Sequence, residues 1–315
     1  MGTAVARTRL AGHVGLSGAS LERILLPDGT RLIVKKLSPL TDFIMRRAHD
    51  DGRLQRMWDD GVFQRMPPAI DHAMLGVERD RDELTVVMRD RTDTLVGDRM
   101  LTREQNRRIL GAASAVYEAF WEEDIRYLCS LRDWVARFRP SDVDADHPLR
   151  EMILRGWERF PDVVPADVAA AVSAIHEDPQ PIARALGQRE RSLVHGDLRL
   201  ANIGLTRDRV VLLDWGSFTA MAPSAMEFAW YLAISWAQIQ APIADIVADF
   251  RDLSGERFDA RALDLGFLLA LAHLGWSKAT AATEQADEAA RARERDHVDW
   301  WVAQVRRALE SWSPT

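Results

Sequence analysis

Cysteine is almost absent from this chain, which has 315 residues and a single thiol at Cys129. One cysteine cannot form an internal disulfide, and it provides neither a C-x-x-C pair nor a thiol cluster for a metal or a redox couple. We therefore expect a protein of a reducing compartment, the cytoplasm.

Several catalytic motifs are also missing. No glycine is followed by lysine, which excludes the phosphate-binding P-loop, and no H-E-x-x-H zinc-binding pattern occurs. The segment at 15–19, GLSGA, does not satisfy the G-x-S-x-G pattern of serine hydrolases. These absences argue against P-loop NTPases, zinc metalloproteases and hydrolases of that type.

Long apolar runs and excess positive charge are lacking as well. Residues 1–15 contain no apolar stretch of the kind a secretory signal needs, and the most apolar later segment, 264–276, is shorter than a bilayer-spanning helix. The formal net charge is −7, and the arginines are scattered among acids. We expect no export, no membrane span and no nucleic-acid partner.

What is present is an ordinary globular composition, 47% hydrophobic and 28% charged, in a chain long enough for two domains or one large bilobal one. Residues 20–26 and 31–37 read as two strands joined by a tight turn at 27–30, and 83–90 reads as a buried strand. Residues 42–60 fit a helix. The first lobe, 1–92, is thus predicted to be strand-rich.

From residue 101 onward the pattern is mainly helical, which assigns residues 93–315 to a second lobe. Apolar residues recur at three- to four-residue spacing in 101–121, and Thr102 is a plausible N-cap for that helix. Further helices are expected at 148–159, 165–176, 223–239, 241–252, 260–280 and 284–311. A strand–loop–strand passage at 191–216 interrupts them.

This passage contains the side chains that could bind a metal or take part in catalysis. It reads SLVHGDLRLANIGLTRDRVVLLDWG, and two short apolar strands joined by a polar turn would bring Asp197, Asn202 and Asp214 to one end of a hairpin. Carboxylate and amide oxygens are the ligands that Mg²⁺ prefers. A carboxylate that does not bind metal, such as Asp197, suits the removal of a proton from an acceptor hydroxyl. The alternative without catalysis is that Asp197 and Asn202 form a loop turn and that Asp214 caps a strand, but this alternative does not account for the spacing of the three residues.

The pattern H-G-D-x-x-x-x-N followed by D-x-G resembles the signature of the aminoglycoside phosphotransferase and choline kinase group. The resemblance implies an α+β, bilobal, protein-kinase-like fold with a small antiparallel-sheet N-terminal lobe and a larger, mainly helical C-terminal lobe. It implies phosphoryl transfer from ATP, or from GTP, with Mg²⁺ as cofactor. Asp197 would be the catalytic base, and Asn202 and Asp214 would be the Mg²⁺ ligands.

The segment RLIVKKL (31–37) resembles the strand that carries the phosphate-contacting lysine of kinases. Because side chains alternate along a strand, Lys35 should point into the cleft and Lys36 outward. The alternative is a pair of solvated lysines on an edge strand. The family usually pairs this lysine with an acid on the first lobe's helix, for which the sequence offers four candidates: Asp50, Asp51, Asp59 and Asp60.

Other nucleotide contacts are implied by position. The loop at 15–20 is similar to the family's nucleotide loop, which assigns Ser17, Gly18 and Ser20 to phosphate binding, although it lacks the full G-x-G-x-x-G. The end of the 83–90 strand, with Met88 and Arg89, resembles the hinge that contacts adenine. Arg199 could steady the γ-phosphate or brace a carboxylate.

The acceptor is expected to be a small molecule, because only nine residues, SFTAMAPSA, separate Gly216 from the next apolar helix and leave little chain to bind a peptide. Aminoglycosides, sugars, amino sugars and amino alcohols are the hydroxylated acceptors considered. Pocket candidates are Glu227, Trp230, Tyr231, Trp276 and Lys278. The stronger alternative is that the aromatics fill the core and that Glu227 lies near a helix start, where a carboxylate favours the helix dipole. The rival hypothesis is a catalytically silent nucleotide- or ligand-binding protein on the same fold.

Overall fold

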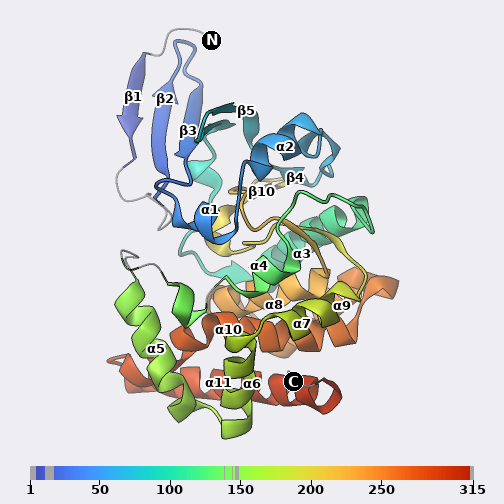
Figure 1. The fold of residues 1–315 in the computed structure, drawn as a ribbon. Helices are drawn as coiled ribbons and strands as arrows, with labels where there is room; N and C mark the ends of the chain where they lie inside the picture. Colours follow the sequence, from blue (N-terminus) through green and yellow to red (C-terminus); the bar gives the residue numbers. More distant parts are fainter. Residues whose placement is uncertain (1–4, 11–17, 138, 144, 146–148, 313–315) are drawn as a thin grey trace.

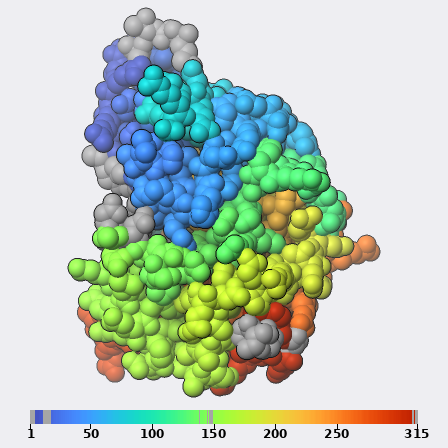
Figure 2. Space-filling view, viewed as in Figure 1, coloured from blue at the N-terminus to red at the C-terminus, as the bar shows by residue number. Residues whose placement is uncertain are grey.

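The computed structural model describes residues 5–10, 18–137, 139–143, 145 and 149–312. The chain forms two lobes, a smaller one built on an antiparallel sheet and a larger one built of helices (Figure 1). In the space-filling view the blue and cyan residues of the first lobe lie against the green to red residues of the second (Figure 2). The predicted α+β, bilobal, protein-kinase-like architecture is confirmed.

The first lobe contains a five-stranded antiparallel sheet with the strand order β1-β2-β3-β6-β5. The predicted strands at 20–26, 31–37 and 83–90 are present as β2, β3 and β6. The edge strand β1 was not predicted, since its four residues are all exposed and show no alternation. The strands are β1 (Ala6–Arg9), β2 (Ser20–Leu25), β3 (Arg31–Leu37), β5 (Met74–Asp80) and β6 (Glu83–Arg89).

The single helix expected over 42–60 is wrong. The structure has two short helices, α1 (Phe43–Arg47) and α2 (Arg53–Asp59). The chain between them turns through left-handed backbone at His49 (φ 49°) and Gly52 (φ 107°), which no right-handed helix can contain. Asp50 holds the turn that leads into α2, because its Oδ1 accepts hydrogen bonds from the N–H groups of Gly52 and Arg53, both at 2.8 Å.

The second lobe is a helical assembly centred on α10, which packs against α5, α8 and α11. Nearly every side of α10 is apolar, as expected for a helix surrounded by others. Thr102 caps α3 with a capping box to Gln105, as predicted. The predicted long helices are present, while α4 and α7 are additional short ones. The helices are α3 (Arg103–Ala119), α4 (Leu131–Val135), α5 (Arg150–Val163), α6 (Ala166–Glu177), α7 (Gln180–Gly187), α8 (Ser224–Ser235), α9 (Ile243–Ser254), α10 (Ala260–Glu284) and α11 (Glu288–Ser311).

The described residues also form three small sheets, two of which include strands of the 191–216 passage. In the first, β4 (Ile70–Asp71) pairs in parallel with β10 (Val210–Leu212), which pairs antiparallel with β9 (Ile203–Leu205). In the second, β8 (Ser192–Val194) pairs with β11 (Ala220–Ala222). In the third, β7 (Leu101–Thr102) pairs with β12 (Ile239–Gln240). Of the helices in the described part of the chain, none has both the length and the apolar character needed to cross a bilayer.

Candidate active site

The turn that follows β8 depends on a glycine. Gly196 has a φ of 84°, and a Cβ on it would lie 2.0 Å from the carbonyl oxygen of Phe218. Any other residue would suffer both the strain of left-handed backbone and a clash with the chain before β11. The glycine therefore fixes the direction in which Asp197 leaves the strand.

His195 is a buried brace for the same turn. Its Nε2 donates to the carbonyl oxygen of Leu213 at 2.9 Å, and its Nδ1 accepts from the N–H of Asp197 at 3.3 Å. Burial lowers the pKa of His195, so the ring is neutral, as this pair of hydrogen bonds requires. The imidazole thereby ties the 195–197 turn to the end of β10.

The Asp197 carboxylate is partly exposed and has two protein partners. The Nδ2 of Asn202 donates to Asp197 Oδ2 at 3.1 Å and to its backbone oxygen at 3.0 Å. Arg199 Nε lies 3.1 Å from the same Oδ2. The side chain of Asp197 is 33% exposed, so an incoming ligand can still reach it.

Asp214 and Lys35 join the two lobes across the cleft. Lys35 Nζ forms an ion pair with Asp214 Oδ1, and Asp214 itself has left-handed backbone with φ 65°. Desolvation in the cleft favours the neutral acid, but the attraction and hydrogen bond of Lys35 outweigh it and lower the pKa of Asp214. Lys36 lies on the opposite face of β3, where its Nζ is 2.6 Å from Glu83 Oε1.

The four aspartates considered as partners for Lys35 have other partners in the structure. Asp50 uses its second oxygen, Oδ2, to accept from Ser217 Oγ at 2.8 Å, which ties α2 to the segment after Asp214. Asp51 forms an ion pair with Arg56. Asp59 accepts a hydrogen bond from Gln55, and Asp60 accepts one from Tyr127. The lysine's carboxylate partner is thus Asp214, 179 positions away in the sequence.

The geometry around Asn202 and Asp214 fits a divalent cation. The N–H of Leu213 donates to the backbone oxygen of Asn202 at 2.9 Å, which holds the two residues side by side. Because the amide nitrogen of Asn202 faces Asp197, its carbonyl oxygen is turned away from that carboxylate. The Asp214 side chain is 45% exposed, and its Oδ2 is not the atom that pairs with Lys35. A carboxylate and an amide oxygen beside substrate phosphates match the usual environment of Mg²⁺.

Residues 15–17 of the predicted nucleotide loop, Ser17 among them, lie outside the described residues, and Gly18 lies next to the residues that lead into α1. Gly18 has a φ of 95°, and a Cβ there would lie 2.1 Å from the carbonyl oxygen of Thr41. Ser20 begins β2 and pairs with Lys36. At Gly18 the chain therefore passes too close to Thr41 for any side chain to fit.

Met88 and Arg89 lie inside the sheet, because β6 is flanked by β3 on one side and β5 on the other. The N–H of Arg89 donates to the Ala73 carbonyl at 2.9 Å, and its guanidinium donates to Asp71 Oδ1 at 2.6 Å. β6 ends at Arg89, so the chain leaves the five-stranded sheet at Asp90. A contact of Met88 or Arg89 with adenine stays a prediction.

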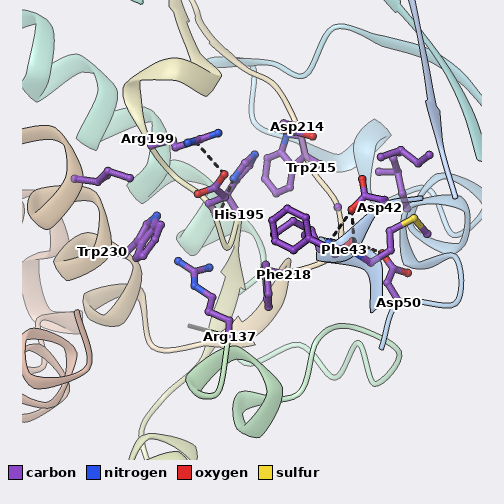
Figure 3. Close-up of a pocket in the computed structure, with 18 of the residues that line it drawn as sticks. Asp42, Phe43, Asp50, Arg137, His195, Arg199, Asp214, Trp215, Phe218 and Trp230 are labelled. Carbon is purple, nitrogen blue, oxygen red and sulfur yellow. Dashed lines mark hydrogen bonds and ion pairs between the residues drawn. The ribbon is translucent and has the colours of Figure 1, made fainter. Parts of the chain in front are cut away.

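A cavity of about 340 Å³ extends from Lys35 past Asp197 and Asp214 into the helical lobe (Figure 3). Trp230 and Trp276, two of the predicted acceptor-site residues, line it. The other three, Glu227, Tyr231 and Lys278, are not among its lining residues, and all are buried in the helical lobe. Apolar side chains form most of the wall: Leu37, Phe43, Ile44, Met45, Leu54, Leu84, Leu149, Ile153, Phe218, Ile234 and Leu274.

Neither the models of known protein families nor the curated protein sequences give a match to this chain. Solved structures do match. Choline kinase from Streptococcus pneumoniae superposes with a TM-score of 0.56 at 11% identity, over 95% of this chain and 94% of that one. A spectinomycin phosphotransferase, solved with ADP and spectinomycin, gives 0.54 at 11% identity, over 98% and 94%. A thermostable mutant of an aminoglycoside phosphotransferase gives 0.51 at 14% identity, over 96% and 95%. The chain has the protein-kinase-like fold.

The sequence did not predict that Glu227, on α8, supports the turn at His195 and Gly196. The buried carboxylate of Glu227 accepts hydrogen bonds from the N–H groups of His195 (3.0 Å) and Gly196 (2.5 Å) and from the hydroxyl of Tyr117 (3.0 Å). Burial raises the pKa of Glu227 to about 7, although the three donors act in the opposite direction. Glu227 is thus a support of the turn and not part of the pocket wall.

Arg137 was missed altogether. It is 4% exposed, and its Nη1 donates to the carbonyl oxygen of Gly196 at 2.5 Å. Its guanidinium lies over the rings of Trp134 and Trp230 at 4.2 and 3.7 Å from their centroids. The one sequence signal is an arginine three positions after a tryptophan in a short apolar segment, which is too common to be informative.

Proposed function

We propose that this chain is a small-molecule kinase that transfers the γ-phosphate of ATP, or of GTP, to the hydroxyl of a small acceptor in the cytoplasm. Aminoglycosides, sugars, amino sugars and amino alcohols are the acceptor classes suggested by the sequence. One observation carries the proposal: Asp197, Asn202 and Asp214 converge with Lys35 at one cleft between two kinase-like lobes. The proposed lobe boundary is between residues 92 and 93.

In this proposal Asp197 accepts the proton of the acceptor hydroxyl. Its Oδ2 is held by Asn202 and Arg199, so the carboxylate has a fixed orientation before the acceptor arrives. A preorganised base costs no rearrangement when the reaction starts. Asp197 lines the cavity, so an acceptor hydroxyl in the cavity can approach its carboxylate directly.

The nucleotide would be held mainly from the first lobe. Lys35 would move from Asp214 toward the phosphates, and Arg199 would add a second positive charge near the γ-phosphate. Asn202 and Asp214 would hold Mg²⁺, which neutralises phosphate charge when bound. Gly18 and Ser20, with Ser17 beyond the described residues, would contact the phosphates, and Met88 and Arg89 would lie next to the adenine.

One observation favours the alternative of a catalytically silent binding protein. Lys35 pairs with Asp214 and not with an acid on α1 or α2, so the lysine occupies an oxygen of a proposed metal ligand. A protein that only binds ligands needs no base and could keep this pair permanently. The two hypotheses differ in whether Asp197 matters for turnover.

The test is phosphate transfer from Mg-ATP and Mg-GTP to a panel of hydroxylated acceptors by wild type, Asp197→Asn and Asp208→Asn. Asp208 is a matched control, since its side chain is 84% exposed in the β9–β10 turn. We expect Asp197→Asn to lower turnover by about a hundredfold or more while nucleotide affinity stays within about twofold. Absence of transfer by wild type, with intact nucleotide binding, would support the silent binder instead.

A further inference from the structure

The part of the cavity beyond Asp197 is lined by apolar side chains from both lobes. α1 supplies Phe43, Ile44 and Met45 from one side, while α5, α8 and α10 supply Ile153, Ile234 and Leu274 from the other. A ligand in this space exchanges water for hydrocarbon, which favours an apolar body and penalises each polar group left unpaired.

The carboxylates among the described lining residues already have partners. Asp42 caps α1 by accepting from the N–H groups of Ile44 and Met45, at 2.9 and 3.1 Å. Asp50 accepts from Gly52 and Arg53 with one oxygen and from Ser217 with the other.

The remaining two carboxylates that line the cavity are Asp197 and Asp214, which lie at the proposed centre of phosphoryl transfer. A ligand ammonium group placed between them would compete with the phosphates and with Lys35. A cationic acceptor would thus need a counter-charge elsewhere in the wall, and the two carboxylates there, Asp42 and Asp50, are only 1% and 7% exposed and already accept hydrogen bonds from the protein.

The aromatic surface around Trp230, where a cation could have been held, is filled by the protein's own guanidinium. Arg137 lies 3.7 Å from the centroid of Trp230, 4.2 Å from that of Trp134 and 5.0 Å from that of Phe218. Figure 3 shows Arg137 between Trp230 and Phe218 at the end of the pocket opposite Asp42.

The charge of Arg137 persists at neutral pH. Burial lowers the pKa of Arg137 only to about 10, so a ligand ammonium near Trp230 would meet a like charge. Like charges in a desolvated site repel strongly.

We infer that the acceptor of this kinase is an alcohol with a compact apolar body and no ammonium group, held between α1 and the α5–α8–α10 wall. The inference rests on the proposed function, since it takes Asp197 as the residue that faces the acceptor hydroxyl. Of the acceptor classes considered above, aminoglycosides, amino sugars and amino alcohols are then disfavoured. Sugars are disfavoured as well, because most of their hydroxyls would lie against hydrocarbon.

The test compares two probes of the same carbon skeleton, hydrocinnamyl alcohol and its amino derivative phenylalaninol, with kanamycin as a polycation. Binding is measured by calorimetry in the presence of Mg-AMP-PNP, and phosphate transfer is measured separately with Mg-ATP. We expect wild type to bind hydrocinnamyl alcohol more tightly than phenylalaninol by about tenfold or more, and kanamycin not measurably.

Two variants of one wall residue isolate the effect of charge. Ile234 is half-buried in the wall, and Ile234→Glu introduces a carboxylate whereas Ile234→Gln introduces an uncharged side chain of the same shape. We expect Ile234→Glu to reverse the preference toward phenylalaninol and Ile234→Gln to lower the affinity for both probes without reversing it. Melting temperatures of the two variants report whether both fold.

The outcomes separate this inference from the proposed function. Selective binding of hydrocinnamyl alcohol without phosphate transfer would count against the kinase proposal, while the preference of the pocket for a neutral, apolar ligand would remain. Tighter binding of phenylalaninol or kanamycin by wild type overturns the inference, whatever the turnover. The inference also fails if the neutral alcohol does not bind while the nucleotide does.

Discussion

The N–H of Gly196 donates a 2.5 Å hydrogen bond to the buried carboxylate of Glu227, and that bond links the turn before Asp197 to the helix α8 beneath it. The second bond, from His195, makes the same carboxylate a bidentate acceptor for consecutive backbone groups. A loop held in this way keeps its shape when the ligand arrives. The position of Asp197 thus depends on a residue that does not reach the pocket.

Glu227 should make stability fall as pH rises. Its pKa is raised from 4.5 to about 7 by burial, so between these values the folded protein binds a proton that the unfolded chain releases. The contribution is fully present below pH 4.5 and is lost as pH rises through 7. It amounts to about 3 kcal/mol in the free energy of unfolding. Urea denaturation of wild type and Glu227→Gln across this range should show the dependence in wild type alone, and a parallel profile for both would contradict it.

Lys35 and Lys36 form a matched pair for mutation. We expect Lys35→Met to lower kcat/KM for the nucleotide by about a hundredfold, because it removes the cation that faces Asp214 in the cleft. Lys36→Met removes an exposed pair with Glu83 and should change kcat/KM by less than about twofold. Steady-state kinetics with varied nucleotide distinguishes them, and equal losses in both variants would show that the cleft lysine has no special role.

Gly196 and Gly29 both have positive φ but differ in the space around them. Gly29→Ala should cost about 1 kcal/mol of stability, since nothing lies within 4 Å of the added Cβ. Gly196→Ala adds a contact with the Phe218 carbonyl and should cost more than about 3 kcal/mol. Urea midpoints measure the difference. Similar midpoints for the two variants would mean that the turn adjusts without strain.

Cys129 should be unreactive in the folded protein. It is 4% exposed, and burial raises the pKa of its thiol to about 12, so very little thiolate exists at pH 8. We expect a thiol-specific chromogenic disulfide to label the native protein at least about a hundredfold more slowly than the urea-unfolded protein. Rapid labelling of the native form would indicate that the β8–β11 region opens.

The features that sequence could predict are those encoded locally. The spacing of Asp197, Asn202 and Asp214 along a short hairpin, the N-cap at Thr102 and the periodicity of the long helices each depend on a few neighbouring residues. The structure has them where the pattern placed them. The left-handed backbone at His49 was not predicted, because histidine adopts this conformation too rarely for the residue type alone to indicate it.

The features that sequence could not predict come from contacts between distant segments. Lys35 meets Asp214 across 179 positions, and the pocket wall combines α1 with helices near the end of the chain. Glu227 was predicted to be either a pocket residue or a carboxylate near a helix start, and only the packing of α8 under the 195–196 turn reveals what it supports. Residue type and spacing contain no information on such long-range partners.

The parallel pairing of β4 with β10 has a mechanical consequence. β4 leads into the first lobe's sheet, and β10 ends two residues before Asp214. Arg209 also donates to the Pro68 carbonyl at 2.9 Å across the same junction. Hydrogen-bonded strands keep their separation while they twist. The two segments are therefore fixed to each other at this junction, and separating the lobes there would break the hydrogen bonds between β4 and β10.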